Sequence, residues 1–484
     1  AAIVNRLSIA DYYETMSNPR FAMPPLIPLA LLVLLILATL GVGLFRPGDR
    51  IGDFFLAGRR AGTVSVGASL TATCLGASAT VGLVGRAYEM GWSAFWWLGS
   101  GAVGLVLLGV FFVKPMRERV GLRTLPEWLG TRYGLPARVL AALLIILMWV
   151  GVISAQWVAA GGILGGMLGV PTGWAIAGAA AVVVAYTAAG GQFSVLRTDI
   201  LQVLLIAIAL FVPLLLLTPP GDAATGAALS GPASAGVPVH QMLALVFVVG
   251  GMYVVGPDLC SRVLTAKGNR EASRGAWLAA CALLVASVAV VSLGLRIRAV
   301  GIQPEESRNA LAALLSAEGV LPGPLALAVQ IGLLGALLSS ADTCLHTAAS
   351  VCVLDVVPSR HSECAPPTVS RRALGARGAV VVIGFAAAAV AHWHPGIIRN
   401  ILLAYSFYAG GLLVPLLLMA CPGFAVRIPR TVVWLTIVAG GFLPVCILLW
   451  RPGLDYAVAG STGCLLSACI LVPAGMLQRG VRRQ

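Results

Sequence analysis

The chain has 484 residues, of which 59% are hydrophobic and only 10% are charged. A soluble domain carries about 25% charged residues, so this composition excludes an ordinary water-soluble fold and indicates that lipid surrounds most of the chain. The net charge of +14 would suit a nucleic-acid-binding protein, but Lys and Arg gather in short segments between apolar runs, which is typical of membrane topology.

Apolar runs of about 20 residues recur from Pro25 to Met476, and each is long enough to cross a bilayer as a helix. A membrane β-barrel would instead show shorter segments of alternating polarity. The sequence therefore predicts an all-α integral membrane protein with about thirteen transmembrane helices. The predicted spans are 25–46, 62–85, 91–114, 138–168, 172–189, 198–218, 238–261, 275–300, 323–355, 376–393, 398–419, 431–450 and 455–477.

The basic segments predict the orientation of the chain. If the spans cross alternately, most Lys and Arg lie on one side, which the positive-inside rule assigns to the cytoplasm. We expect a multi-pass protein of the inner (plasma) membrane with its N-terminus outside and its C-terminus in the cytoplasm. Residues 1–24 contain acids and aromatics and are interpreted as an extracytoplasmic segment, not a signal peptide. The basic segments are 46–60, 114–138, 262–274, 360–377 and 479–483.

The loops between the spans are short, and even the longest, which follows span 198–218, is rich in small residues, Pro and Gly. None is long enough to form a soluble nucleotide-hydrolysing domain, and neither GxxxxGK[ST] nor HExxH occurs in the chain. Energy for transport would therefore come from an ion gradient.

Two spans carry features that interrupt helices. Span 62–85 has hydroxyl residues clustered around Gly76, and span 238–261 has Gly256 followed by Pro257. The two spans are five apart, so 2–6 and 7–11 could form two five-helix repeats of opposite orientation. Paired broken helices in such a repeat indicate a midplane binding site. The alternative is that the glycines only allow close helix packing.

The ninth span reads ALLSSADTCLHTAAS, which places hydroxyl groups on one helical face with Asp342 beside them. Hydroxyl, carboxylate and carbonyl oxygens suit small hard cations such as sodium. An acid inside a span is costly, so a functional role is the first hypothesis, and a carboxylate satisfied by local hydroxyls is the alternative. His346, one turn further, could relay a proton or bind a metal, or could simply pack among helices.

Asp199 lies near the start of the sixth span, in GGQFSVLRTDILQ. An acid at this place can stabilise the helix dipole without any further role. The sequence leaves both interpretations of Asp199 open.

Six motifs in order together resemble the sodium/solute symporter family. They are DFFLAGRRAG, ASLTATCLGASATVG, TLPEWLGTRYG, SAQWVAAGG, GGQFSVLRTDILQ and LLSSADTCLHTAAS, from Asp53 to about Ser350. The resemblance implies a LeuT-type 5+5 inverted repeat with one helix before it and two after. The expected divisions are an N-terminal segment 1–24, a peripheral helix 25–46, a ten-helix core 62–419, two peripheral helices 431–477 and a tail 478–484.

The resemblance also implies ion sites. One sodium would bind the backbone carbonyls of Ala72, Leu75 and Ala336 and the hydroxyls of Ser339 and Ser340. Some members hold a second sodium, and here its ligands would be Asp199, Ser339, Asp342 and Thr343. Other members carry a hydroxyl at the position of Asp342, so the second ion could be sodium or a proton.

The implied solute pocket lies against the helix breaks and is sparse in polar groups. Sugar-transporting relatives carry amides and acids where this chain has Ala79 and Leu98. No mid-membrane arginine is evident to clamp a carboxylate. A small zwitterionic, cationic or weakly polar solute is therefore expected in preference to a sugar. The expected lining residues are Cys74, Gly76, Ser78, Ala79, Trp97, Ser100, Gln156 and Tyr253.

The functional hypothesis is a sodium-coupled secondary symporter that imports a small organic solute by alternating access. Its expected partners are that solute and membrane lipid, with no nucleic acid. The alternative is a non-transporting sensor, or a membrane subunit of a larger complex, that keeps a transporter fold. An enzyme is not expected, because no convergent nucleophile–base pair or metal triad is evident in the sequence.

Overall fold

The computed structural model describes residues 55–119, 121–217, 238–304, 310–316, 321–356, 367–394, 396–420, 428–451 and 453–481. The predicted segment 1–24, the first predicted span and residues 482–484 of the tail lie outside these ranges. Within them the chain is helical apart from loops and one isolated β-bridge between Ala61 and Ala266. Eleven helical stretches there are long and apolar enough to cross a membrane, and one of them, Ser78–Arg117, joins parts of two predicted spans. The all-α membrane prediction is confirmed.

The predicted second span is broken, as expected. Helix α4 ends at Cys74, and Leu75 leaves the helical region with φ −96° and ψ 44°. Helical turns resume at Ser78 after two further residues. The first part of the chain contains η1 (Ala57–Arg59), α4 (Thr63–Cys74), η2 (Ser78–Gly82), α5 (Leu83–Met90), η3 (Gly91–Phe95), α6 (Trp96–Leu107), η4 (Leu108–Phe112), α7 (Val113–Arg117), α8 (Leu125–Leu168) and α9 (Thr172–Leu216).

The predicted seventh span is broken too. Helix α11 ends at Val255, Gly256 is extended with φ −60° and ψ 129°, and Pro257 begins α12. Proline suits the first position of a helix because its missing N–H would have no partner there. This part contains α11 (Val239–Val255), α12 (Pro257–Thr265), α13 (Asn269–Ala299), α14 (Ala310–Ser316), α15 (Gly323–Val351) and η7 (Cys352–Val356).

Helix α9 contains two of the membrane spans, Thr172–Ala189 and Val195–Leu216. Tyr186 and Asp199 both reach the same part of α15, at Leu338 and Ser339 respectively. A straight helix would place these two residues roughly 20 Å apart along its axis. The chain therefore bends between the two spans.

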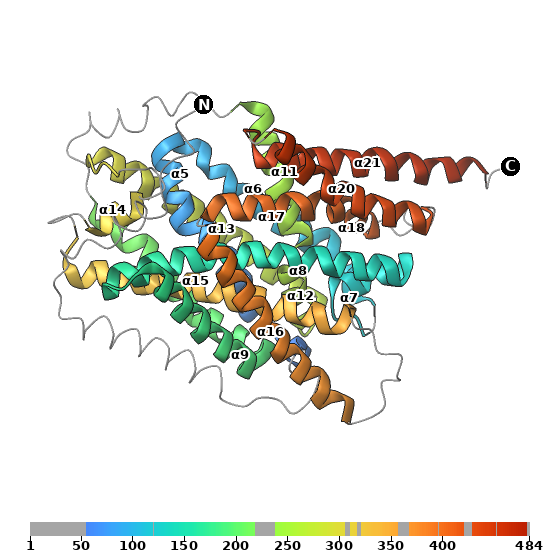
Figure 1. The fold of residues 1–484 in the computed structure, drawn as a ribbon, viewed down its shortest axis with the longest axis horizontal. Helices are drawn as coiled ribbons and strands as arrows, with labels where there is room; N and C mark the ends of the chain where they lie inside the picture. Colours follow the sequence, from blue (N-terminus) through green and yellow to red (C-terminus); the bar gives the residue numbers. More distant parts are fainter. Residues whose placement is uncertain are drawn as a thin grey trace.

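Helix α15 lies at the centre of the bundle and packs against α4, α8, α9 and α16. Every residue from 332 to 351 is buried. In Figure 1 most helices run along the horizontal axis, and α9 and α16 cross the others obliquely. Polar residues on a helix that is buried on all sides require a structural or functional explanation.

The last helices pack along one edge of the bundle, where α20 and α21 lie against each other and against η8. Glycines permit this contact, since a Cβ on Gly410 would lie 2.2 Å from the carbonyl oxygen of Gly440. These elements are α16 (Pro367–Trp393), α17 (Ile397–Tyr408), η8 (Ala409–Leu413), α18 (Val414–Met419), α20 (Arg430–Trp450) and α21 (Tyr456–Val481).

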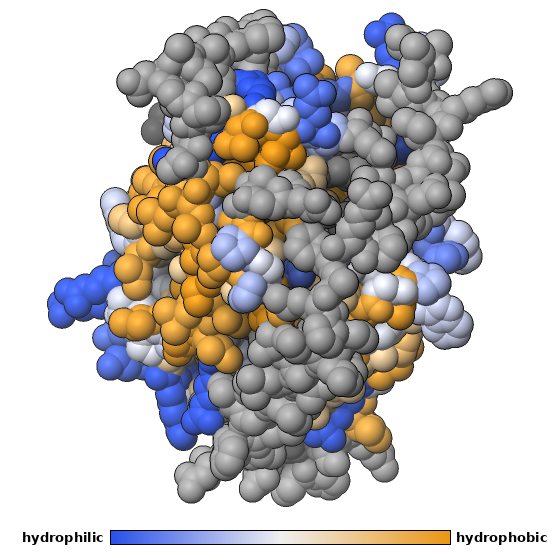
Figure 2. All heavy atoms as spheres, turned by 90° about the vertical axis from the view of Figure 1, so that its left-hand side faces the viewer, coloured by the Kyte–Doolittle hydropathy of each residue, from blue (hydrophilic) through white to orange (hydrophobic). Residues whose placement is uncertain are grey.

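The outside of the bundle exposes large apolar side chains. Leu204 is 61% exposed, Val382 70% and Leu435 71%. Figure 2 shows hydrophobic side chains over a broad area of one face, with hydrophilic side chains at its margins. Such a surface is expected where the solvent is lipid, because helices satisfy their own backbone there.

Candidate functional site

The break after α4 touches the hydroxyl face of α15. The Ser340 hydroxyl donates a hydrogen bond of 3.1 Å to the carbonyl oxygen of Thr73. Gly76 lies so close that a Cβ there would be 2.6 Å from Oγ of Ser340 and 2.8 Å from Nε2 of Gln156. The Gln156 side chain in turn accepts a hydrogen bond of 2.9 Å from the backbone N–H of Ala77. Helices α8 and α15 thus both support the broken segment.

The five residues expected to bind the first sodium lie on the two sides of this contact, and all are buried. Ser339 donates its hydrogen to the Asp199 carboxylate at 2.7 Å, and Ser340 donates to the backbone. Both hydroxyl oxygens therefore keep lone pairs for a cation. The end of α4 adds carbonyl oxygens, which carry the negative end of the helix dipole. This donor set of neutral oxygens suits sodium. Its members are Ala72, Leu75, Ala336, Ser339 and Ser340.

The residues expected to bind a second cation form two hydrogen-bonded pairs, Ser339–Asp199 and Thr343–Asp342, which Arg262 joins into one polar network. Asp199 accepts from Ser339 and also from Ser69 on α4. Asp342 accepts 3.0 Å and 3.3 Å hydrogen bonds from Tyr186 and Thr343. Both carboxylates have no exposed surface. Ser69 and Tyr186 are additions to the predicted set; no local pattern in the sequence distinguishes them from packing residues.

Arg262 on α12 also belongs to this network and was assigned in the sequence to a basic cytoplasmic segment. Its side chain is fully buried. Nη2 donates to Oγ1 of Thr343 at 2.5 Å and lies 3.9 Å from Oδ2 of Asp199. A buried arginine thus lies near a carboxylate in the apolar helical stretch Val239–Thr265, where none was evident from the sequence. The sequence feature that could have indicated its burial is its position five residues after Pro257, where the span is broken.

The charges of this network do not balance by themselves. Two carboxylates, Asp199 and Asp342, face one guanidinium in a region without solvent exposure. Buried charge is tolerated only when it is paired or neutralised. The network thus contains one more carboxylate than guanidinium group.

A cavity of about 500 Å³ opens beside the broken segment. Five of the eight expected solute-binding residues line it: Cys74, Gly76, Ser78, Gln156 and Tyr253. Ser340, an expected sodium ligand, lines it as well. The remaining lining residues are Thr73, Trp149, Val152, Met252, Asp258, Leu259, Cys344, Ile401 and Tyr405.

Three expected solute-binding residues lie elsewhere. Trp97 lines a different cavity of about 560 Å³, together with Arg86 and Asp455. Ser100 donates its hydroxyl to the carbonyl oxygen of Trp97 at 3.1 Å, and Ala79 is fully buried. Neither Ser100 nor Ala79 is part of the lining of the cavity beside the break.

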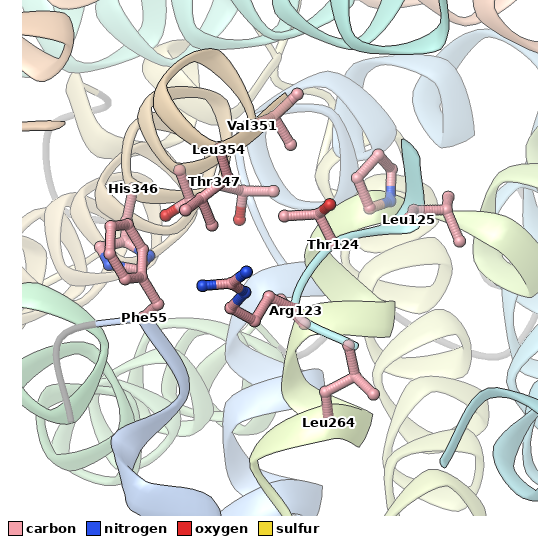
Figure 3. Close-up of a pocket in the computed structure, with 12 residues that line it drawn as sticks. Phe55, Arg123, Thr124, Leu125, Leu264, His346, Thr347, Val351 and Leu354 are labelled. Atoms are coloured by element: carbon pink, nitrogen blue, oxygen red, sulfur yellow. The ribbon is translucent and has the colours of Figure 1, made fainter. Parts of the chain in front are cut away.

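A third cavity, of about 380 Å³, lies along α15 beyond Asp342 (Figure 3). His346 and Thr347 line it from α15, and Arg123 and Thr124 line it from the start of α8. Figure 3 shows the Arg123 guanidinium pointing across the cavity towards Phe55 and His346. No group of three or more His, Cys, Asp or Glu suited to a metal occurs among the described residues. His346 therefore lines this cavity and, among the described residues, has no cluster of metal ligands around it.

The sequence profile of the sodium:solute symporter family matches residues 54–421, which is most of the chain and includes every site residue above. The chain belongs to the sodium:solute symporter family. This family consists of transporters, not enzymes.

Curated relatives agree with this membership. The chain is 30% identical over 179 residues to the sodium/glucose cotransporter of Vibrio parahaemolyticus, covering 36% of this chain and 33% of the relative. It is 31% identical over 178 residues to the human sodium/iodide cotransporter, covering 36% of this chain and 27% of the relative. The chain thus spans about a third or less of the length of these relatives.

Solved structures show the same fold. A substrate-bound, outward-open Na+-coupled sialic acid symporter superposes with a TM-score of 0.79 at 18% identity, over 93% of this chain and 97% of that one. The nucleobase-cation-symport-1 transporter MHP1 superposes with a TM-score of 0.57 at 16% identity, over 90% and 96% of the two chains. The expected LeuT-type inverted repeat is confirmed.

Proposed function

We propose that the protein is a sodium-coupled secondary symporter that moves a small organic solute across the membrane by alternating access. The observation that carries this proposal is the contact between the broken end of α4 and the hydroxyl face of α15. There Ser340 donates to the carbonyl oxygen of Thr73 and Ser339 donates to Asp199. Both hydroxyl oxygens are buried and keep lone pairs with which they can bind a cation.

The same residues give a physical reason for coupling. Thr73, Cys74 and Gly76 line the solute cavity, and the neighbouring carbonyls of Ala72 and Leu75 are the expected sodium ligands. A sodium ion held there orders the segment that forms one wall of the cavity. By linkage, the solute then raises sodium affinity by the same factor by which sodium raises solute affinity.

The second cation, sodium or a proton, would be held by Asp199, Ser339, Asp342 and Thr343, whose network carries one uncompensated negative charge. In this proposal residues 62–419 are the transporting core and 431–477 are peripheral. The positive-inside distribution supports a plasma-membrane protein with an outer N-terminus and a cytoplasmic C-terminus.

Sodium binding is tested first, by following the unfolding temperature of the purified protein as sodium replaces potassium. Ser340→Ala removes one oxygen ligand and should raise the sodium concentration needed for half the stabilisation by roughly tenfold or more. Ser287→Ala is the matched control, because Ser287 is also fully buried and donates to a backbone carbonyl, that of Phe95 at 3.0 Å. An unchanged sodium requirement in Ser340→Ala would contradict the site.

Transport is tested in proteoliposomes with an inward sodium gradient and labelled solutes. We expect accumulation that collapses when the gradient is dissipated and that is lost in Ser340→Ala. Sodium binding without gradient-driven accumulation of any solute that binds would instead identify a non-transporting member of the fold.

A further inference from the structure

We propose, on the basis of the proposed function, that the transported solute carries a positively charged nitrogen and that the Asp258 carboxylate is its counter-ion. Asp258 lies in the first turn of α12, directly after the break at Gly256. Its side chain lines the cavity beside the broken α4 and is only 8% exposed.

Asp258 is the single charged residue in the lining of this cavity among the described residues. Asp258 forms no close ion pair among the described residues: Arg262, one turn further along α12, contacts Thr343 and Asp199 and attracts the Asp258 carboxylate only at longer range, while backbone N–H groups of α12 donate to it. A carboxylate with so little exposed surface favours a directly contacting positive partner. A neutral solute would leave it without one, and an anionic solute would be repelled.

Aromatic side chains form much of the remaining wall. Trp149, Tyr253 and Tyr405 line the cavity together with the aliphatic side chains of Val152 and Ile401. The faces of aromatic rings attract cations, and an apolar wall strengthens that attraction by excluding water. These groups suit a small organic ammonium compound.

The hydroxyl of Thr73 provides a second polar contact. Its Oγ1 is buried, lines the cavity and has no hydrogen-bond partner among the described residues. Buried polar atoms are rarely left unpaired, so this hydroxyl indicates a place for a polar group of the solute. Gln156 lines the same wall.

The charges of the whole interior agree with a cationic solute. The acids Asp199, Asp258 and Asp342 are buried near one buried arginine, Arg262. The second cation or proton in the Asp199–Asp342 network and one monovalent organic cation at Asp258 would together balance these four side chains. Sodium and solute binding would then be coupled electrostatically as well as through the segment at the end of α4 that both sites share.

A structural role for Asp258 is the competing explanation, because a carboxylate in the first turn stabilises a helix through its dipole. Asp258→Asn distinguishes the two, since asparagine keeps the shape and loses the charge. A structural role predicts lower stability with unchanged preference among ligands. A counter-ion role predicts loss of binding for cations alone.

The experiment measures the unfolding temperature of the purified protein in sodium with pairs of small compounds of equal shape. Each pair contains an ammonium compound, primary or quaternary, and its uncharged carbon isostere, such as choline and 3,3-dimethylbutan-1-ol. We expect stabilisation by ammonium members only, and a roughly tenfold or greater increase in the required concentration in Asp258→Asn. Glu118→Gln is the charge-matched control, because this acid is exposed and far in sequence from the cavity.

Tyr405→Leu serves as a second variant if Asp258→Asn does not fold. It removes a ring face and should weaken binding of quaternary ammonium compounds by roughly fivefold. The proposal is overturned if neutral isosteres stabilise as well as cations, if no ammonium compound stabilises, or if Asp258→Asn binds cations like the wild type. A sodium titration without solute reports separately on the proposed function, so the two failures are distinguishable.

Discussion

Arg262 shows how one side chain can govern a buried polar region. It is the positive group between the two carboxylates of the ion network, and it joins α12 to α15 through Thr343. The broken span places it there, because the short helix α12 begins only at Pro257 and directs its next turn towards α15. Arg262, which the sequence analysis assigned to a basic cytoplasmic segment, is therefore fully buried.

Replacing this arginine should be costly. Arg262→Gln leaves Asp199 and Asp342 without a counter-charge, and breaking a buried pair from one side costs about 3–5 kcal/mol. We expect a lower unfolding temperature and a changed sodium requirement. Arg60→Gln, at an exposed position, is the control. Adding Asp199→Asn to Arg262→Gln should recover part of the stability, and equal effects of Arg262→Gln and Arg60→Gln would refute this assignment.

At the scale of elements, the broken segment after α4 can approach α8 and α15 closely because Gly76 has no side chain. Gly76 allows the broken segment to lie against Ser340 and Gln156, which come from α15 and α8. Any β-carbon would separate these contacts, although glycine costs helix stability elsewhere. The two alternatives considered for the glycines of span 62–85, a helix break and close packing between helices, therefore both apply at Gly76.

Gly76→Ala should consequently weaken sodium binding without unfolding the protein. Overpacking a tight contact costs about 1–3 kcal/mol, and here the displaced atoms include the Ser340 hydroxyl. Gly178→Ala is the control, because Gly178 lies in membrane helix α9 and a Cβ there meets nothing within 4 Å. Sodium titrations followed by unfolding temperature should show a higher half-stabilising concentration only for Gly76→Ala. Identical titrations for the two variants would exclude this contact from the sodium site.

At the scale of the whole molecule, the first half of α8 is tied to η7, the short helix that follows α15. Arg138 Nε lies 2.6 Å from Oδ1 of Asp355, and its Nη2 donates to the carbonyl oxygen of Leu354 at 2.9 Å. Glu127 lies 3.8 Å from the same guanidinium. This connection borders the cavity of Figure 3, whose lining includes Leu354. If the protein works by the proposed alternating access, we expect this tie to open in one of its states.

Breaking the tie should shift the population towards the state that is open at this end. Arg138→Gln removes a charge-assisted hydrogen bond, so reaction of a maleimide with a cysteine introduced by Ser350→Cys should quicken by roughly tenfold. Fragment-ion mass spectrometry that places the label at position 350 separates this signal from the neighbouring native Cys344 and Cys352. Exchanging the charges, with Arg138→Asp and Asp355→Arg together, should restore slow labelling. Equal labelling rates with and without Arg138 would show that the tie does not control access.

Much of the membrane architecture was predictable because lipid imposes simple constraints. Apolar runs of sufficient length must form helices, and Gly256 followed by Pro257 must disturb one of them. The hydroxyl face around Ser339 and Ser340 follows from the period of a helix. These inferences depend on neighbours in the chain, so the sequence alone contains them.

The partners of those residues could be found only in the tertiary structure. Tyr186, Arg262 and Asp258 reach the sites from α9 and α12, and Trp97 and Ser100 lie away from the cavity that they were expected to line. Which side chains meet depends on how α9 bends and how α12 turns after the break, and both are decided by packing between distant segments. The sequence by itself determined a helical membrane transporter fold with an oxygen-rich helix face. The tertiary structure decided which charges share its interior, because burial and pairing depend on contacts that no local pattern encodes.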